Sequence, residues 1–413
     1  MKLPSALRAL RYYNFRLYFG GQAISLIGTW MQRMAVSWLI YTLTHSALIL
    51  GLVAFAGQIP VMLLSPYAGA FTDRHSRYRI LLTTQIASMI QAGLLALCVY
   101  LNYYNVTIIV ILSVILGIIN AFDTPSRQSL MIVLVGNKTD LPNAIALNSS
   151  MVTLARLLGP AAAGILLSSF GEDVCFFINF LSFIAVIASI LLMKIKLPER
   201  TKQTEDIWEG LKQGYNYLKQ HDGIRYAILL MALTSFIVMP YSTLLPVYAK
   251  TVFKGDVTTF SWLNSISGLG ALLGAIYMAN LKPGKNLFKV MVYSSLLLSL
   301  GLFFFSFMNS LLLALFIIMI AEAGMLSQIA ATNTYIQTTV DEHMRGRVIS
   351  YYVMAFQGMQ PIGSFLIGFS AHKIGAPHTV LWEALVGMIT ALGFIPYFKK
   401  VRREKERKLL EKV

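Results

Sequence analysis

The chain has 413 residues, of which 56% are hydrophobic and only 13% are charged, whereas about 25% of the residues of a soluble protein are charged. This composition excludes a soluble enzyme and predicts a protein made mostly of membrane spans. The formal net charge is +16, but the basic residues stand between apolar runs instead of gathering on one soluble face, which argues against nucleic-acid binding.

Twelve apolar runs follow one another along the chain, each near the length of about 20 residues that a bilayer-spanning helix needs. Only helices and closed barrels satisfy the backbone inside lipid, and these runs are much longer than the roughly 10-residue strands of a barrel. We therefore expect an all-α integral membrane protein with twelve transmembrane helices. The expected spans cover about residues 15–43, 46–71, 80–101, 106–126, 143–169, 174–194, 225–249, 258–281, 287–308, 311–335, 347–371 and 377–398.

Lysine and arginine concentrate on one side of these spans. Most of the 34 basic residues fall in connections on the same side as the N-terminus, and cytoplasmic connections retain positive charge. Both termini are therefore expected in the cytoplasm. The longest polar connection separates six spans from six, which predicts a six-helix bundle at 1–195, a cytoplasmic linker at 196–224, a second six-helix bundle at 225–398 and a basic cytoplasmic tail at 399–413.

The linker contains a helical pattern. Its apolar residues at helical spacing are Ile207, Leu211, Tyr215 and Leu218. This pattern predicts a short amphipathic helix on the cytoplasmic face, and a flexible, solvated linker is the alternative. The basic tail is expected either on anionic inner-leaflet lipid or free in solvent.

A weak internal repeat relates the two halves of the chain. Residues 121–124 (Ala-Phe-Asp-Thr) are echoed by 331–334 (Ala-Thr-Asn-Thr), and the segment around Pro160 is echoed by the segment around Pro361. Parallel six-helix repeats are one way in which transporters are built. The repeat therefore supports a transport function.

A charged connection follows the second expected span. Its sequence at 69–79, Gly-Ala-Phe-Thr-Asp-Arg-His-Ser-Arg-Tyr-Arg, resembles the signature loop of the major facilitator superfamily, with Ser76 where the family commonly has a second glycine. The resemblance implies that superfamily's fold and a cytoplasmic latch that favours the outward-facing state. The latch residues at this loop would be Gly69, Asp73, Arg74 and Arg77. The glycine is expected to permit close helix approach; the alternative is that the charges only fix the topology.

The fifth expected span carries a glycine–proline segment. Its sequence around Arg156, Gly159 and Pro160 looks like a motif of the superfamily's exporters, with Ala155 and Ala163 in place of glycines often found there. Small residues let helices pack closely and proline loosens a helix locally. The resemblance implies a gating role for this segment, and ordinary close packing is the alternative.

Further stretches are similar to one branch of the superfamily, the group that contains the enterobactin exporter and macrolide efflux proteins. These stretches are residues 14–17, 30–33, 122–128, 143–149 and 345–348. The resemblance implies a secondary active transporter of the bacterial inner membrane that exports a small amphipathic molecule, a siderophore or a hydrophobic antibiotic, by alternating access and proton antiport. We group Arg127, Arg345 and Arg347 with the latch residues.

Ionisable residues also occur inside or at the margin of the expected spans. They are Arg33, Asp123, Arg127, Arg156 and Glu322. At a helix centre each costs at least about 2.5 to 3.5 kcal/mol unless it is paired or hydrated, so each is a candidate functional residue. Asp123 and Arg156 stand at similar expected depth, which favours a buried ion pair between them. Proton coupling is the other role open to Asp123.

Glu322 is the leading candidate for proton coupling. Its span, about 311–335, contains no cationic residue of its own. An apolar setting favours the protonated form of a carboxyl group, which would let Glu322 bind and release a proton. The alternative is that another helix supplies a partner for it.

Arg33 and its neighbours on the first span are the expected substrate site. Trp30 and Gln32 stand beside Arg33, and an arginine with aromatic neighbours suits a substrate that carries a carboxylate, catecholate or phosphate. The tenth span presents a polar face made by Gln328, Asn333 and Gln337. Such residues are expected to line the pathway or to bond across helices.

Other classes of function lack their sequence signals. The six histidines and two cysteines form no metal-ligand spacing, and no nucleotide-binding glycine-rich loop with a following Lys-Ser/Thr occurs. We therefore expect no cofactor and no enzymatic activity, but a monomeric secondary transporter whose partners are protons, a small-molecule substrate and the lipid bilayer. A translocator of lysophospholipid or another anionic lipid is the alternative function.

Overall fold

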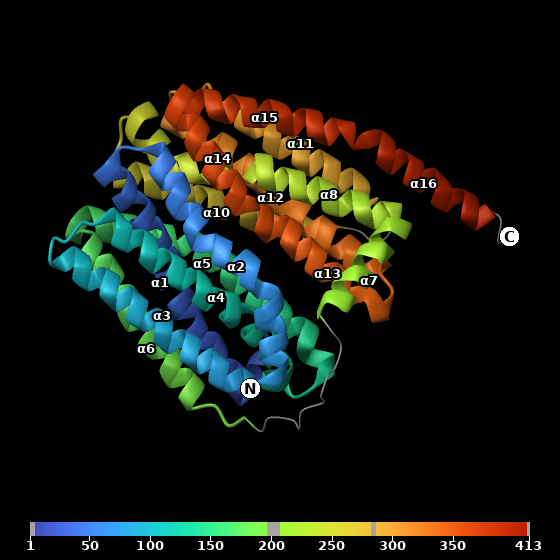
Figure 1. Cartoon of the computed structure of the whole chain (residues 1–413), viewed down its shortest axis with the longest axis horizontal. Helices are drawn as coiled ribbons and strands as arrows, with labels where there is room; N and C mark the ends of the chain where they lie inside the picture. The colour runs from blue at the N-terminus through green and yellow to red at the C-terminus, as the bar shows by residue number, and fades with distance from the viewer. Residues whose placement is uncertain (1–4, 196–206, 282–285, 411–413) are drawn as a thin grey trace. The chain divides into compact units, whose positions relative to one another are not determined.

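The computed structural model describes residues 5–195, 207–281 and 286–410, and every regular element within these ranges is helical. This confirms the predicted all-α architecture (Figure 1), in which each helix pairs its backbone groups within its own segment. Packing divides the chain into two compact units. The N-terminal unit is made of Met1–His45, Phe55–Thr204 and Gly255–Ser265, and the C-terminal unit of Ser46–Ala54, Glu205–Lys254 and Ile266–Val413.

The first half of the chain forms long helices joined by short turns. Its elements are η1 (Ser5–Arg11), α1 (Tyr13–Thr44), α2 (Ala47–Arg74), α3 (Arg77–Tyr100), α4 (Val106–Val135), η2 (Lys138–Asp140), α5 (Leu141–Phe170) and α6 (Glu172–Leu191). Helix α1 packs against α5 and α6, and α3 packs against α4 and α6. The first helix therefore lies at the centre of the N-terminal unit.

Small residues bring α1 and α6 close together. A Cβ atom added at Gly21 would overlap the side chain of Ser189, and one added at Gly28 would overlap the side chain of Asn179. Lipid tails are as apolar as leucine side chains, so helices in a membrane associate through such close packing and through hydrogen bonds. The two glycines therefore explain why α6 lies directly on α1.

The second half repeats the pattern of long helices, with more interruptions. Its elements are α7 (Ile207–Gln220), α8 (Asp222–Ile237), η3 (Met239–Leu244), α9 (Leu245–Val247), η4 (Tyr248–Val252), α10 (Val257–Ala279), α11 (Leu287–Phe305), α12 (Leu311–Thr339), η5 (Glu342–Met344), α13 (Arg345–Val353), η6 (Met354–Gly358), α14 (Met359–Ile374), α15 (Ala376–Gly393) and α16 (Ile395–Leu410). Helix α16 continues the line of α15 (Figure 1).

Prolines and π turns break two of these helical stretches. Pro240 is the second residue of η3, and Pro246 is the second residue of α9. Proline has no backbone N–H, so the regular hydrogen-bond ladder of α8 cannot run on through them. The elements η4 and η6 are single π turns, a feature that often occurs at functional sites.

The turns support the predicted relation between the two halves. Gly171 joins α5 to α6 with a φ of 91°, and Gly375 joins α14 to α15 with a φ of 84°. His45 follows α1 and Lys254 follows η4, and both have positive φ as well, 48° and 51°. Residues other than glycine rarely have a positive φ. Positive φ therefore recurs after corresponding helices of the two halves, a similarity that the sequence did not reveal.

Ten helical stretches among the described residues are long and apolar enough to cross a membrane. They coincide with ten of the predicted spans. The other two predicted spans, 15–43 and 347–371, also fold as helices, namely α1 and the stretch from α13 to α14. Large apolar side chains on the spans are exposed, for example Leu312 at 77% and Ile389 at 70%, as expected for surfaces that face lipid.

The helix predicted in the linker is present as α7. It packs against α13 (Figure 1). The hydroxyl of Tyr351 on α13 donates a hydrogen bond of 2.9 Å to the backbone oxygen of Leu211, and Gly214 makes room for the Tyr351 ring. The hydroxyl of Tyr217 donates to Asp341 at 3.1 Å. Helix α7 is therefore docked on the C-terminal unit.

Candidate functional site

Two guanidinium groups flank Trp30 of α1. The Cζ atom of Arg33, one turn further along α1, lies 5.0 Å from the centre of the Trp30 ring. The Cζ atom of Arg156, on α5, lies 6.0 Å from the same ring. Both distances allow a cation–π interaction. Arg33 is exposed, whereas Trp30 and Arg156 are half-buried, so the three residues form one accessible cluster within the N-terminal unit.

A glycine lets α5 reach this tryptophan. A Cβ atom at Gly159 would lie 2.5 Å from the Cβ atom of Trp30 and 3.0 Å from the backbone oxygen of Ile27, closer than side chains pack. Arg156 precedes Gly159 by three residues, so both lie on the same face of α5. The exporter-like segment therefore brings Arg156 to the predicted substrate residues, a meeting that the sequence analysis did not foresee.

Arg33 supplies the cluster with an accessible positive charge. Arg33 has no ion-pair partner among the residues that the structure describes. A guanidinium group presents paired N–H donors that match carboxylate and phosphate oxygens, and the indole ring offers an apolar face beside them. The arrangement can therefore hold an anion that also carries an apolar or aromatic part.

Asp123 of α4 forms its ion pair within its own helix. Its Oδ2 atom accepts a hydrogen bond from Arg127, four residues further on. Its Oδ1 atom accepts from Thr84 at 3.0 Å and from Gln85 at 2.6 Å, both on α3. The expected pairing with Arg156 is thus replaced by pairing with Arg127, which stands one helical turn away on the same face. Asp123 is only 3% exposed and links α4 to α3.

Glu322 of α12 meets a tyrosine from another element. The residue is 1% exposed, and its Oε1 atom accepts a hydrogen bond of 2.6 Å from the hydroxyl group of Tyr241 in η3. A Cβ atom at Gly270 of α10 would lie 2.9 Å from that of Glu322. Three elements of the C-terminal unit therefore meet at this carboxyl group, and Tyr241 offers it a neutral hydrogen-bond donor.

A second buried carboxyl group escaped the sequence analysis. The Oε2 atom of Glu383, on α15, and the hydroxyl group of Tyr248, in η4, are both buried without a hydrogen-bond partner in the described part of the chain. Glu383 falls inside the apolar run 377–398, and the criterion that singled out Glu322 applies to it equally.

Gln32 lies apart from the cluster around Arg33. It is 4% exposed. Its Nε2 atom donates to Gln91 of α3 at 2.9 Å, and its Oε1 atom accepts from Asn179 of α6 at 2.7 Å. Gln32 therefore links three helices of the N-terminal unit instead of joining its neighbours Trp30 and Arg33.

The three predicted polar residues of α12 differ in their surroundings. Gln328 is fully buried and donates to the hydroxyl group of Thr234 on α8 at 3.0 Å. Asn333 is half-buried and Gln337 is exposed, and Gln337 donates to Asn333 at 3.0 Å. Gln328 therefore bonds across helices, whereas Asn333 and Gln337 remain open to a pathway.

The loop that resembles the signature motif is a tight connection. Helix α2 ends at Arg74, which is exposed, and α3 begins at Arg77. The hydroxyl group of Ser76 accepts a hydrogen bond from the backbone N–H of Arg79 at 3.4 Å, so this serine caps α3. The side chain of Asp73 lies outside the described residues, and its role in a latch stays a prediction.

Other predicted gating residues have mixed surroundings. A Cβ atom at Gly69 would meet no described atom within 4 Å, so close helix approach does not require this glycine here. Arg77 donates to the backbone oxygen of Ser129 on α4 at 3.4 Å. The backbone oxygen of Pro160 accepts a hydrogen bond of 2.8 Å from Ser261 of α10, within the N-terminal unit.

Of the two arginines after α12, Arg347 lies beside α7. Arg345 begins α13 and is exposed. Arg347 is half-buried and donates to the sulfur atom of Met344 at 3.3 Å. Cβ atoms added at Gly210 and Gly214 would lie 3.8 Å and 3.4 Å from the Arg347 side chain. The linker helix therefore packs on one of the predicted latch residues.

One known family matches nearly the whole chain. Its members are described as transmembrane secretion effectors, and the match covers residues 4–412. The chain belongs to this family. As a secretion effector of the major facilitator superfamily, it is a multi-pass membrane efflux transporter of small molecules and not an enzyme.

Curated relatives of this secretion effector transport different molecules. The staphyloferrin A transporter of Staphylococcus aureus (strain NCTC 8325 / PS 47) is 27% identical over 402 residues, 96% of this chain and 98% of the relative. Macrolide efflux protein A of Streptococcus pyogenes is 23% identical over 405 residues, 95% of this chain and 98% of the relative. Family membership therefore leaves the cargo open.

A solved structure shows the same fold. The crystal structure of a POT family transporter in complex with a thioalcohol-conjugated peptide matches with a TM-score of 0.74 and 13% identity, over 94% of this chain and 96% of that chain. At this identity the match concerns the fold alone. It agrees with the major facilitator fold expected from the sequence.

Proposed function

We propose that this secretion effector exports a small anionic amphipathic molecule of the siderophore class across the bacterial inner membrane. Export proceeds by alternating access coupled to proton antiport, with both termini in the cytoplasm. The observation that carries the proposal is the position of Trp30, whose ring lies 5.0 Å from the Arg33 guanidinium and 6.0 Å from that of Arg156.

The charge of this cluster favours an anion. Each guanidinium group gains charge-assisted hydrogen bonds from a carboxylate or catecholate, and these bonds are about twice as strong as those between neutral groups. A neutral macrolide could lie on the indole face of Trp30 but would leave the charge of Arg33 uncompensated. The similarity to a staphyloferrin A transporter over almost the whole chain supports a siderophore as the cargo.

Glu322 supplies the proton-coupling group in this proposal. The carboxyl group is 1% exposed and accepts a hydrogen bond of 2.6 Å from the hydroxyl group of Tyr241. Asp123 is less suited, because Arg127 and two donors from α3 already hold its charge.

Transport by purified protein in proteoliposomes with an imposed pH gradient tests the proposal. The cargoes are a catecholate siderophore and a neutral macrolide. Losing one charge-assisted hydrogen bond, worth about 1.5 to 3 kcal/mol, corresponds to a decrease of roughly ten- to a hundredfold. We therefore expect Arg33→Gln and Arg156→Gln each to lower siderophore transport at least tenfold and macrolide transport by less than about threefold.

Lys289→Gln is the matched control, because it removes an exposed cation of α11 outside the cluster. It should leave both rates unchanged. Equal losses for siderophore and macrolide in Arg33→Gln would show that Arg33 has a structural role and would refute the assignment of the cargo site. Movement of lysophospholipid head groups without any soluble cargo would instead favour a lipid translocator.

A further inference from the structure

A cavity of about 430 Å³ lies at one end of the N-terminal unit. Its lining comes from the residues just before and at the start of α1, from the last turn of α4 and from the residues after α6. Three spanning helices begin or end there, so the cavity lies at the level where a membrane meets water. This site is separate from the cluster around Trp30.

Asn14 and Lys194 fix one side of the cavity. The Nδ2 atom of Asn14 donates to the backbone oxygen of Lys194 at 2.9 Å, and its Oδ1 atom accepts from the backbone N–H of Lys194, also at 2.9 Å. The backbone of Lys194 is therefore held, while its side chain is exposed and its Nζ atom lies 5.9 Å from the Tyr13 ring. This presents an ammonium group at the mouth of the cavity.

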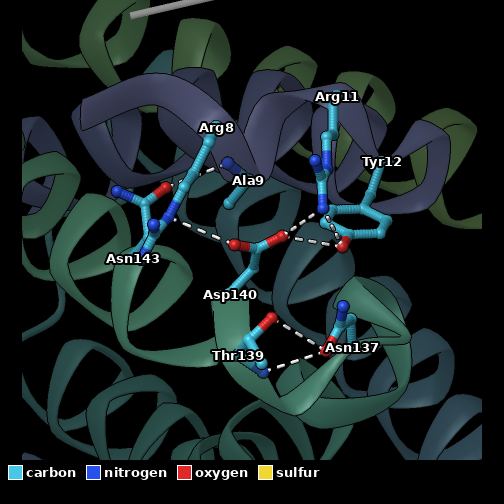
Figure 2. Close-up of polar contacts among 8 residues, drawn as sticks. All are labelled: Arg8, Ala9, Arg11, Tyr12, Asn137, Thr139, Asp140 and Asn143. Atoms are coloured by element: carbon cyan, nitrogen blue, oxygen red, sulfur yellow. Dashed lines mark hydrogen bonds and ion pairs between the residues drawn. The ribbon is translucent and has the colours of Figure 1, made fainter. Parts of the chain in front are cut away.

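A buried aspartate organises the neighbouring segment η1 (Figure 2). Asp140 is 4% exposed. It accepts from Arg8 Nε at 3.1 Å, from Arg11 at 2.6 Å and from the hydroxyl group of Tyr12 at 2.8 Å. These contacts place Tyr12, a lining residue, at the cavity wall. The hydrogen bond to Tyr12 and the charge of Asp140 raise the pKa of Arg11, so Arg11 is charged.

The charges around the cavity do not balance. Lys194 is the charged residue among the described lining residues, and the described neighbours Arg8, Arg11 and Asp140 bring the charge of these four residues to +2. The end of α4 contributes the aliphatic residues Val133, Leu134 and Val135 to the lining; Val133 is half-buried, whereas Leu134 and Val135 are 2% and 1% exposed. The cavity therefore combines positive charge with an aliphatic surface at the membrane boundary.

We propose that this cavity binds one anionic phospholipid, with its phosphate at Lys194 and its glycerol and upper acyl groups against the end of α4. A basic residue near a membrane surface attracts anionic lipid, and the aliphatic wall favours a lipid over free phosphate. The bound lipid fastens η1 and the residue after α6 to the end of α4. It is a resident molecule and not the transported cargo.

Native mass spectrometry of the full-length protein with added phosphatidylglycerol or phosphatidylcholine tests this proposal. We expect one phosphatidylglycerol to bind at least fivefold more tightly than phosphatidylcholine, since each basic residue near the surface contributes about a fivefold preference. Lys194→Gln should abolish that preference, and Lys194→Arg should retain it. Asn14 contacts only the backbone of Lys194, so these variants should fold, as gel filtration would verify.

Two controls keep this test independent of the transport proposal. Lys289→Gln, which removes an exposed cation elsewhere, and Arg33→Gln should both bind phosphatidylglycerol like the unaltered protein. Equal affinity of the two lipids, or unchanged preference in Lys194→Gln, would overturn the proposal. Displacement of the lipid by millimolar inorganic phosphate would also overturn it, because the aliphatic wall would then contribute nothing.

Discussion

Individual charged residues in the spans separate into two kinds. Asp123 has three donors within hydrogen-bond distance, and it holds helices together. Arg33 is exposed beside Trp30, and the carboxyl group of Glu322 accepts a hydrogen bond from the uncharged Tyr241. A residue with a saturated set of partners has little to gain from binding a cargo or a proton, so the second kind carries the expected function.

The role of Glu322 predicts a loss of pH dependence in Glu322→Gln. The amide cannot bind and release a proton, so we expect downhill cargo exchange to persist while transport driven by a pH gradient falls at least tenfold. Proteoliposomes with and without the gradient provide the measurement. Glu383→Gln is the comparison, because it removes another buried carboxyl group of the C-terminal unit, whose Oε2 atom has no hydrogen-bond donor among the described residues, and it should retain gradient-driven transport if the bond to Tyr241 matters. A Glu322→Gln protein with full gradient-driven transport would refute the coupling role.

At the scale of elements, the close contact between α1 and α5 requires a glycine at position 159. We expect Gly159→Ala to displace Trp30, since its Cβ atom would lie 2.5 Å from the Trp30 Cβ atom. Overpacking of this kind costs about 1 to 3 kcal/mol. The expected result is a lower melting temperature and weaker siderophore transport.

Gly20→Ala provides the comparison for that variant. A Cβ atom at Gly20 meets nothing within 4 Å, and alanine is a better helix former than glycine by about 0.5 to 1 kcal/mol. The melting temperature of Gly20→Ala should therefore be unchanged or slightly higher than that of the unaltered protein. If Gly159→Ala had the same melting temperature and transport activity as Gly20→Ala, the close contact with Trp30 would contribute neither to stability nor to transport.

The docking of α7 is a second feature at this scale. The hydroxyl group of Tyr217 donates to Asp341 at 3.1 Å and accepts from the backbone N–H of Asp341 at 3.2 Å. Burial raises the pKa of Tyr217, so the hydroxyl keeps its proton at neutral pH and these bonds persist. Tyr217→Phe removes both bonds, each worth about 0.5 to 1.5 kcal/mol.

Hydrogen exchange across residues 207–220 measures that change. We expect faster exchange in Tyr217→Phe, and no change in Tyr215→Phe, because Tyr215 is 50% exposed and phenylalanine keeps its ring. Identical exchange in both variants would show that the bonds to Asp341 do not hold α7.

At the scale of the whole molecule, the long elements follow directly from the sequence. The expected span at 80–101 appears as α3, Arg77–Tyr100, and the one at 174–194 as α6, Glu172–Leu191. Such agreement arises because a run of about 20 apolar residues is a local property that only a helix satisfies in lipid. The prolines of the seventh expected span are visible in the sequence, but the π turn η4 depends on tertiary packing.

The partners of the embedded charges were harder to predict. An argument from depth paired Asp123 with Arg156, whereas Arg127 stands one turn away on the same helix and forms the pair. Arg156 instead reaches Trp30, which depends on the approach of α5 to α1 at Gly159. Which helices touch, and through which faces, is a tertiary property that a single sequence does not specify.

Comparison of the small molecules in cells and in spent medium tests the central claim most directly. The strains are a deletion strain and the same strain complemented with the unaltered gene, Arg33→Gln or Glu322→Gln, all grown with scarce iron. The account predicts that an anionic chelator leaves the medium and accumulates inside the deletion strain, and that only the unaltered gene restores its export. Identical concentrations of anionic small molecules in the spent medium of the deletion and complemented strains would contradict siderophore export by this protein.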